Sequence, residues 1–269
     1  MSNNPPPPDG NLGRFRPFAE LLFSLSFLTR LPIPFTRTID PPALAQSMRF
    51  FAIAGAAIGA LTGISLVLLN WLHVPHFLAA ALTVLFSLLL TGGLHEDGLS
   101  DSADGLFGGK NRERRLEIMR DSRIGSYGAM ALFSCLLAKV GAFDAMYALA
   151  PLTLISISAA SGAFSRAMVV DMMWATRPAR SDGLAVFAGR PSRNSALFAI
   201  ATGGALAFVA GLPLHPESGV IAVLAAVAIT GLLRRFAMRL IGGQTGDICG
   251  ATQVLVEIAM LTVFISTIG

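Results

Sequence analysis

Residues 77–109 read FLAAALTVLFSLLLTGGLHEDGLSDSADGLFGG, and this stretch contains the two features that decide the fold. Its first part, residues 77–94, is apolar and has no charged side chain. That length is sufficient to cross a bilayer core, which needs roughly 17–25 apolar residues per helix. The second part, from His95 onward, adds three aspartates and several glycines directly after the apolar run. This order predicts a transmembrane helix followed by a polar site at one membrane face.

The composition of the whole chain agrees with a membrane protein. Of its 269 residues, 54% are hydrophobic and only 13% are charged. Soluble domains contain about 25% charged residues, because charge is needed to cover their surface. The composition therefore argues against a soluble globular, a disordered or a fibrous protein and favours a polytopic helical membrane protein. Two cysteines are too few for a disulfide framework.

Seven apolar runs are candidates for transmembrane helices. They are 50–72, 77–94, 129–147, 152–175, 195–213, 218–233 and 251–268, of which 218–233 is short. Residues 18–29 are also apolar but too few to span, and Leu31-Pro32-Ile33-Pro34 follows them, so we expect a re-entrant or interfacial helix there. The predicted fold is an all-α bundle of about seven transmembrane helices plus this short N-terminal helix.

Residues 1–17 differ from the rest of the chain. Four consecutive prolines, Pro5 to Pro8, are incompatible with a helix or a packed core. We expect a disordered tail, and no signal peptide, because the apolar stretch that follows is short and has no cleavage-like end. Residues 18–269 are then expected to form a single transmembrane domain.

The basic residues alternate along the chain. Eighteen of the 20 Lys and Arg residues fall in four segments: 14–49, 110–123, 177–193 and 234–239. The intervening loops near 73–76, 148–151 and 214–217 have none. By the positive-inside rule, the N-terminus and all four basic segments are cytoplasmic and the C-terminus is outside.

Three aspartates in the cytoplasmic segment 95–128 suggest a metal site. Asp97, Asp101 and Asp104 are spaced i, i+4 and i+7, which places them on one face of a helix. Their like charges repel, and Mg²⁺ neutralises such a group well because it prefers carboxylate and phosphate oxygens. Glu96 is a fourth candidate ligand. The alternative is an acidic helix face in contact with solvent.

Arginines and glycines follow the aspartates. Arginine binds phosphate oxygens with a planar fork of donors, and glycine lets the backbone approach a ligand closely. Alternatively, the glycines serve packing and the arginines form surface pairs. Together with the carboxylates, they predict phosphoryl transfer at the membrane surface, a reaction that depends on positioning and charge neutralisation. Asp121 and Asp247 are candidates for a general base.

The strings HEDGLSDSADGLFGG (95–109) and RRLEIMRDSRIGSYG (114–128) resemble the cobalamin (cobamide) 5'-phosphate synthase family, also called adenosylcobinamide-GDP ribazoletransferases. The resemblance extends from about residue 20 to the end of the chain. Further matching segments are Phe27–Pro34, Ser165–Met168, Arg177-Pro178 with Gly183-Leu184, and Gly243–Asp247 with Gly250 and Glu257. Glu96, Ser100 to Ser102 and the proline-rich start depart from the family pattern, and no aspartate of the motif is affected.

The resemblance implies a reaction in the last steps of cobalamin biosynthesis. Adenosylcobinamide-GDP is joined to α-ribazole or its 5'-phosphate, GMP is released, and Mg²⁺ is required. The ribazole 3'-hydroxyl would attack the phosphorus attached to cobinamide. The implied setting is the bacterial inner membrane, with the lipid bilayer as partner and no nucleic acid. A homo-oligomer, or a complex with other cobalamin-assembly enzymes, is a further hypothesis.

Roles follow from the motifs and the resemblance. The expected metal ligands are Glu96, Asp97, Asp101 and Asp104. The expected catalytic residues are Asp121, Asp247 and Arg123. The expected substrate-binding residues are Arg30, His95, Arg115, Arg166, Gln253 and Glu257. For Arg166 the structural alternative is an ion pair with Asp171, and Lys139 is less suggestive of a site.

Two other functions stay open at this point. The spacing D-G-x-x-D-x-x-D-G also looks like the metal motif of CDP-alcohol phosphotransferases, which make phospholipids. A transporter would also contain charges inside the membrane and glycine-interrupted helices. Transport predicts polar groups near the bilayer midplane, whereas the sequence gathers them at one face.

Overall fold

The computed structural model describes residues 16–33 and 43–268, and within these ranges the chain forms helices and connecting turns with no β-strand. The predicted proline-rich tail lies outside the described residues, except for Arg16 and Pro17. The helices are α1 (Pro17–Leu28), α2 (Leu44–Ser47), α3 (Phe51–Trp71), α4 (His76–Thr91), α5 (Leu94–Gly108), α6 (Arg112–Ile118), α7 (Ser126–Met146), α8 (Pro151–Ala175), α9 (Leu184–Ala188), α10 (Arg193–Gly211), α11 (Ser218–Leu240) and α12 (Gly246–Ser266). A 3₁₀ turn, Met48–Phe50, connects α2 to α3.

The predicted all-α, polytopic fold is confirmed. Six helical segments of the described chain are long and apolar enough to cross a membrane, and the pair α4 and α5 makes a seventh if it is counted as one bent span. The protein is therefore a multi-pass membrane protein. The run 218–233, expected to be short, continues as helix to Leu240. The added residues include three arginines, whose long side chains can reach the polar interface from the end of a spanning helix.

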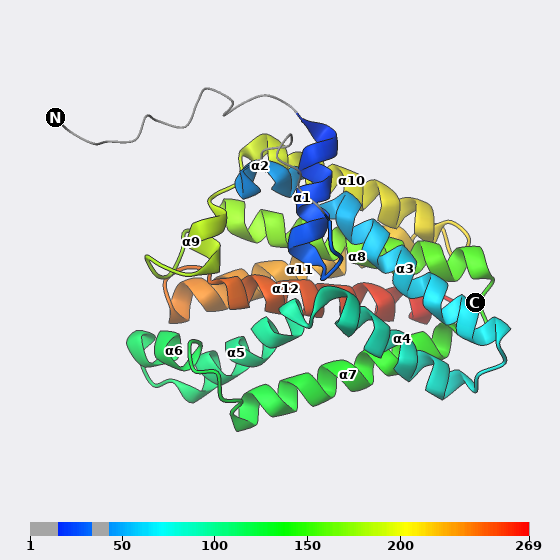
Figure 1. Ribbon diagram of the computed structural model, residues 1–269, viewed down its shortest axis with the longest axis horizontal. Helices are drawn as coiled ribbons and strands as arrows, with labels where there is room; N and C mark the ends of the chain where they lie inside the picture. The colour runs from blue at the N-terminus through cyan, green and yellow to red at the C-terminus, as the bar shows by residue number, and fades with distance from the viewer. Residues whose placement is uncertain (1–15, 34–42, 269) are drawn as a thin grey trace.

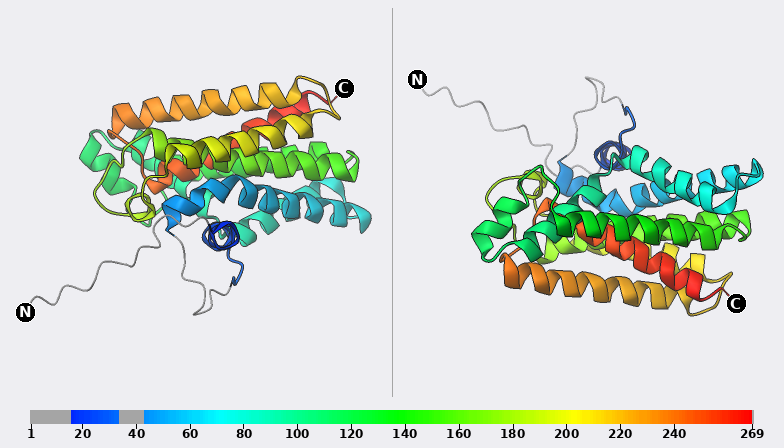
Figure 2. Two further views of the ribbon diagram at one scale, coloured as in Figure 1. Left: turned by 90° about the horizontal axis from the view of Figure 1, so that it is seen from above. Right: turned by 90° about the horizontal axis from the view of Figure 1, so that it is seen from below.

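The spanning helices lie side by side and alternate in direction (Figures 1 and 2). The connections that contain α6 and α9 lie at one end of the bundle, and the C-terminus lies at the opposite end (Figure 1). The basic segments 110–123 and 177–193 therefore share one end, as the alternation of charge requires. This gives the bundle one strongly basic end.

Small residues allow α3 and α8 to pack with their backbones in contact. Gly55, Gly59 and Gly63 recur at every fourth position of α3. A Cβ atom on Gly55 would lie 2.2 Å from the carbonyl oxygen of Gly162, and one on Gly59 would lie 2.1 Å from that of Ser158. Such close approach replaces the hydrophobic effect as the source of packing energy between helices in lipid. It makes α8, most of which is buried, the central helix of the bundle.

Two consecutive glycines separate the apolar α4 from the polar α5. Gly92 and Gly93 have φ angles of +68° and +66°, a region that residues with a side chain rarely adopt. The axes of α4 and α5 consequently differ by 91°. The prediction of one continuous helix over 77–94 is wrong at its end, because the helix stops at Thr91.

The short N-terminal helix α1 lies across the bundle rather than along it (Figure 1). The predicted apolar helix over 18–29 is thus present, as Pro17–Leu28. Its end is tied to the bend after α4, because the backbone amide of Arg30 donates to the carbonyl oxygen of Leu90 at 2.8 Å. This contact places α1 beside the start of α5.

Candidate active site

The acidic face of α5 is held against the start of α12 by two glycines. A Cβ atom on Gly98 would lie 2.9 Å from the carbonyl oxygen of Asp247. One on Gly250 would lie 3.0 Å from the carbonyl oxygen of His95. Because both positions lack a side chain, the two backbones touch. The contact brings Asp247 to the aspartates of α5, from which it is far apart in the sequence.

The carboxylates gathered there carry excess negative charge. The carboxylates of Asp97, Asp247 and Asp104 repel a negative charge on Asp101. The guanidinium of Arg180 partly offsets this repulsion. Arg180 Nη2 lies 3.2 Å from Asp247 Oδ2. Within residues 16–33 and 43–268, neither Asp97 nor Asp101 forms an ion pair. Among the described residues, three neighbouring carboxylates, those of Asp97, Asp101 and Asp247, thus have one guanidinium, that of Arg180, to offset their charge.

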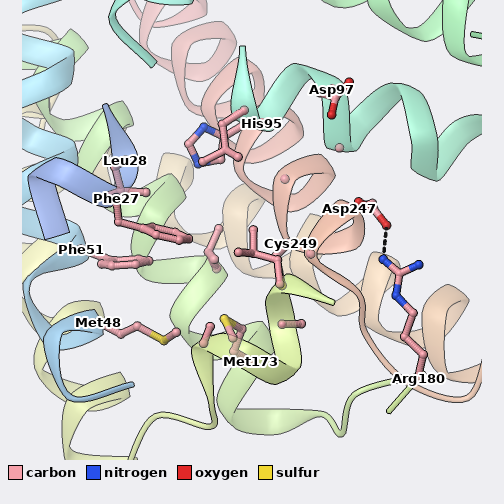
Figure 3. Close-up of a pocket in the computed structure, with 18 residues that line it drawn as sticks. Phe27, Leu28, Met48, Phe51, His95, Asp97, Met173, Arg180, Asp247 and Cys249 are labelled. Atoms are coloured by element: carbon pink, nitrogen blue, oxygen red, sulfur yellow. Dashed lines mark hydrogen bonds and ion pairs between the residues drawn. The ribbon is translucent and has the colours of Figure 1, made fainter. Parts of the chain in front are cut away.

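A cavity of about 160 Å³ opens between these charges and the apolar core. We call it the open cavity, and 18 residues from α1, α3, α5, α8, α9, α12 and two connecting segments line it. Asp247 and Arg180 lie on one side of it, and Phe27 and Phe51 lie on the other (Figure 3). One half of the cavity is therefore charged and the other is apolar.

Arg180 is the functional candidate that the sequence interpretation missed. Its Nη1 atom is buried and has no hydrogen-bond partner, so it is a free donor beside the cavity. The loop that carries it is held by two backbone hydrogen bonds, from Ala179 N to Gln244 O at 2.7 Å and from Gln244 N to Arg177 O at 2.9 Å. The signal for Arg180 in the sequence is its place between Arg177-Pro178 and Gly183-Leu184, the two family-like pairs of this loop.

Asp104 has a different environment from Asp97 and Asp101. Its carboxylate accepts hydrogen bonds from the backbone amides of Gly125 at 2.7 Å and Gly128 at 2.9 Å. These amides belong to the first turn of α7, where the helix dipole favours a negative charge. Cβ atoms on the two glycines would come within 2.4 Å of the carboxylate oxygens. The geometry thus explains Asp104, Gly125 and Gly128 as a helix-capping unit.

Glu96 points to the other face of α5, away from the aspartates. Lys139 Nζ lies 2.8 Å from Glu96 Oε1 and 2.7 Å from Glu257 Oε2. Arg166 Nη1 lies 4.0 Å from Glu257 Oε1. We call these four residues the interior charge cluster. Glu96, predicted to be a metal ligand, is not brought to Asp97 and Asp101, because adjacent residues of a helix face different directions.

Two predicted substrate-binding residues adjoin the interior charge cluster. Gln253 donates from Nε2 to Ser165 Oγ at 3.2 Å, and together with the cluster it lines a second, much smaller cavity of about 20 Å³. His95 lines both cavities. The expectation that polar groups cluster at one face of the membrane is therefore incomplete, since a second group of charged residues lies within the bundle.

The partner of Arg166 differs from the structural alternative considered for it. Asp171 pairs with Arg234 of α11, which leaves Arg166 to face Glu257. Lys139, judged less suggestive, links both glutamates of the cluster. A lysine in an apolar transmembrane run was the signal that pointed to it, because a charge in that position is costly without a partner.

The remaining predicted residues do not line the open cavity. Arg123 and Asp121 form an exposed ion pair in the loop between α6 and α7, and the Arg123 guanidinium lowers the pKa of the Asp121 carboxyl by hydrogen bonding. Arg115 donates to the carbonyl oxygens of Leu106 and Leu240, both at 3.3 Å. Arg30 is exposed and lies over Gly92.

The predicted Mg²⁺ can be tested against this geometry. Among the described residues, no three His, Cys, Asp or Glu side chains already surround one point. Mg²⁺, however, is commonly held by one or two carboxylates, with water and substrate phosphates as the other ligands. Asp97, Asp101 and Asp247 supply such oxygens, and the three carboxylates outnumber the one guanidinium, that of Arg180, beside them. The donor set therefore fits a divalent cation that binds together with a phosphate.

Comparison with known proteins adds independent information. Residues 20–265 match the family described as cobalamin-5-phosphate synthase. A relative from Azorhizobium caulinodans, named adenosylcobinamide-GDP ribazoletransferase, is 43% identical over 253 residues, which cover 91% of this chain and 95% of the relative. A protein of the same name from Bradyrhizobium diazoefficiens is 39% identical over 247 residues, covering 91% and 92%. No solved structure was found to match.

Proposed function

The chain belongs to the cobalamin-5-phosphate synthase family and is a transferase of the last steps of cobalamin biosynthesis, and we propose that it joins adenosylcobinamide-GDP to α-ribazole, or its 5'-phosphate, in a Mg²⁺-dependent reaction. The single observation that carries the mechanism is the presence of Asp97, Asp247 and Arg180 in the lining of the open cavity, with Asp101 one helical turn beyond Asp97 and close enough to feel their charges. The two alternatives, a CDP-alcohol phosphotransferase and a transporter, have no support from the relatives compared above, which are named as ribazoletransferases.

In the proposed reaction, the 3'-hydroxyl oxygen of the ribazole forms a bond to the phosphorus attached to cobinamide. The bond from that phosphorus to the bridging oxygen breaks, GMP leaves with the electron pair, and the hydroxyl proton is transferred to a base. Bound Mg²⁺ would neutralise phosphate charge and would be held by Asp97 and Asp101. The chain's own residues must then orient the two substrates and accept the proton.

Arg180 and Asp247 have the chemistry for these two tasks. The buried Nη1 of Arg180 is free to donate to a phosphate oxygen, while Nη2 is held by Asp247. Charge accumulates on the leaving phosphate in the transition state, and a preorganised guanidinium stabilises it. Asp247 lines the same cavity and is the better candidate for the base, because Asp121 lines a different surface depression.

The decisive experiment is a reconstituted assay. Purified protein in liposomes, given adenosylcobinamide-GDP and α-ribazole, should release GMP with Mg²⁺ and stop when the metal is chelated. Restoration by added Mg²⁺ separates metal dependence from damage to the protein. GMP release that persists after complete chelation would contradict the metal proposal, and no cobamide product under any condition would contradict the substrate assignment.

We further propose that the basic end of the bundle, with the open cavity, faces the cytoplasm of the bacterial inner membrane. The charge alternation supports this orientation. Lys110→Cys and His215→Cys place a thiol at exposed positions near opposite ends, while the native Cys135 and Cys249 are buried. In intact spheroplasts, a membrane-impermeant maleimide should label only the His215→Cys variant. Labelling of only Lys110→Cys would reverse the topology.

A further inference from the structure

The apolar half of the open cavity has no role in phosphoryl transfer. From α1, the 3₁₀ turn, α3 and α8, every lining side chain is a hydrocarbon or a thioether. These residues are Phe27, Leu28, Met48, Phe51, Val169 and Met173. Short helix α9 adds Leu184, Ala185 and Ala188. The polar side chains of the lining all belong to α5, α12 and the Arg180 loop.

Two aromatic rings form part of this apolar wall. Phe27 and Phe51 lie with ring centroids 5.9 Å apart and planes inclined by 19°. Figure 3 shows both rings on the side of the cavity opposite Asp247 and Arg180, with Cys249 between the two sides. Flat aromatic ligands gain from contact with such rings in addition to the burial of their area.

We propose that this apolar half is the subsite for the aromatic base of the ribazole, and that Phe27, Phe51 and Met173 determine which base is accepted. The inference rests on the proposed function. The base of α-ribazole is a dimethylbenzimidazole, which is flat and bicyclic and carries two methyl groups, so it matches a wall without hydrogen-bonding side chains. Its ribose then lies toward Asp247 and Arg180, where the 3'-hydroxyl must react.

The other substrate, adenosylcobinamide-GDP, has two ring systems that could compete for the apolar half of the cavity: its guanine and its corrin ring. Guanine carries an amide and an amino group, and burying these against hydrocarbon would leave them without partners, which is strongly unfavourable. The whole cavity measures about 160 Å³, below the roughly 300–1,000 Å³ of sites that enclose a complete drug-sized ligand, so it can take a small part of a substrate such as one two-ring base but not the much larger corrin ring. The chemistry of the wall therefore favours the ribazole base.

The first test compares Phe51→Leu with its neighbour Phe50→Leu. Phe50 is also buried, but its ring contacts Phe198 and it does not line the cavity. Phe51→Leu should raise the KM for α-ribazole about three- to tenfold, the loss expected for one aromatic contact, and should leave the KM for adenosylcobinamide-GDP within about twofold. Phe50→Leu should change neither KM by more than about twofold.

The second test alters the size of the subsite and does not depend on the fraction of active protein. Each variant is given α-ribazole and an analogue with a larger, tricyclic base, and the ratio of the two kcat/KM values is measured. Met173→Ala should shift this ratio toward the larger base by about fivefold or more, since roughly three heavy-atom volumes are vacated. Met172→Ala removes the same volume from an adjacent buried residue outside the cavity and should not shift it.

The outcomes distinguish this inference from the proposed function. A rise in the KM for adenosylcobinamide-GDP with Phe51→Leu would assign the apolar half to that substrate and overturn the inference. An unchanged base ratio in Met173→Ala would also overturn it. In both cases GMP release by the unaltered protein would leave the proposed function intact, whereas absence of GMP release from the unaltered protein would remove the proposed function and this inference together.

Discussion

Two groups of charged residues lie on opposite faces of α5, and they differ in how their charges are balanced. In the interior charge cluster, two carboxylates meet two cations, and each carboxylate lies within 2.8 Å of Lys139. Beside the open cavity, Arg180 is the one cation that the described part of the chain sets against Asp247 and Asp101, and Asp97 forms no ion pair there.

The difference indicates separate tasks for the two faces. A buried charge without a partner costs several kcal/mol, so a closed cluster inside a membrane bundle has to be neutral. An imbalance is tolerable where a cation and a phosphate can enter. The balanced cluster therefore holds α5, α7, α8 and α12 together, and the unbalanced group is available for substrate. His95 lines both cavities and connects the two regions.

The largest effect is expected from unbalancing the interior charge cluster. Lys139→Met leaves Glu96 and Glu257 with Arg166 as their remaining cation, and should lower the free energy of unfolding by about 3–5 kcal/mol. The loss can be measured as a reduced melting temperature in detergent. The double variant Lys139→Met/Glu96→Gln restores neutrality and should recover part of the stability. An unchanged melting temperature in Lys139→Met would show that the cluster is not a structural element.

Loss of a charge from the acidic group beside the open cavity should affect stability and turnover in the opposite way: stability should be kept and turnover should be lost. Asp101→Asn removes one of three repelling carboxylates, so the melting temperature should stay constant or rise, while GMP release should fall about 10²–10³-fold. Asp182→Asn, in an exposed pair with Arg120, is a suitable control and should alter turnover by less than about twofold. Wild-type turnover in Asp101→Asn would refute its role in metal binding.

Arg180→Lys tests the free donor of the cavity while keeping its positive charge. A lysine has no planar fork and cannot contact Asp247 and a phosphate oxygen with the same geometry. Turnover should fall about ten- to a hundredfold, as expected for one lost charge-assisted hydrogen bond. Arg177→Lys, in the same loop with its Nε donating to the carbonyl oxygen of Gly242, is the matched control. Equal losses in both variants would point to the loop rather than to Arg180.

The smallest effect is expected outside both regions. Asp121→Asn breaks the exposed ion pair with Arg123, and surface pairs contribute little to stability. The lowered pKa of Asp121 also makes this carboxylate a weaker base. We expect turnover and melting temperature close to those of the unaltered protein. A loss of turnover above about tenfold would return Asp121 to the list of catalytic candidates.

Much of this comparison could be predicted from the sequence, for identifiable reasons. The helix that carries Asp97, Asp101 and Asp104 followed from their spacing, because side chains four residues apart share a helix face. The spanning helices followed from apolar runs. The role of Glu96 did not follow, because the direction of one residue within an acidic string depends on which helix packs against each face.

The roles of Arg180 and Lys139 could not be predicted from local sequence patterns either. Arg180 lies in a loop whose position depends on backbone hydrogen bonds to the turn before α12, at Gln244. Lys139 becomes important only because Glu96 and Glu257, on two other helices, converge on it. Neither contact joins neighbours in the sequence, so no local pattern contains it.

The sequence by itself determined the environment, the number of candidate spans and the family, because hydrocarbon selects apolar runs and the motifs are contiguous. The tertiary structure alone decided which charges are neutralised and which are left for a ligand. The physical reason is that neutralisation depends on distance in space. The backbone contact of Gly98 with α12 brings Asp247 to Asp101, whereas Glu96, on the opposite face of α5, is directed toward Lys139.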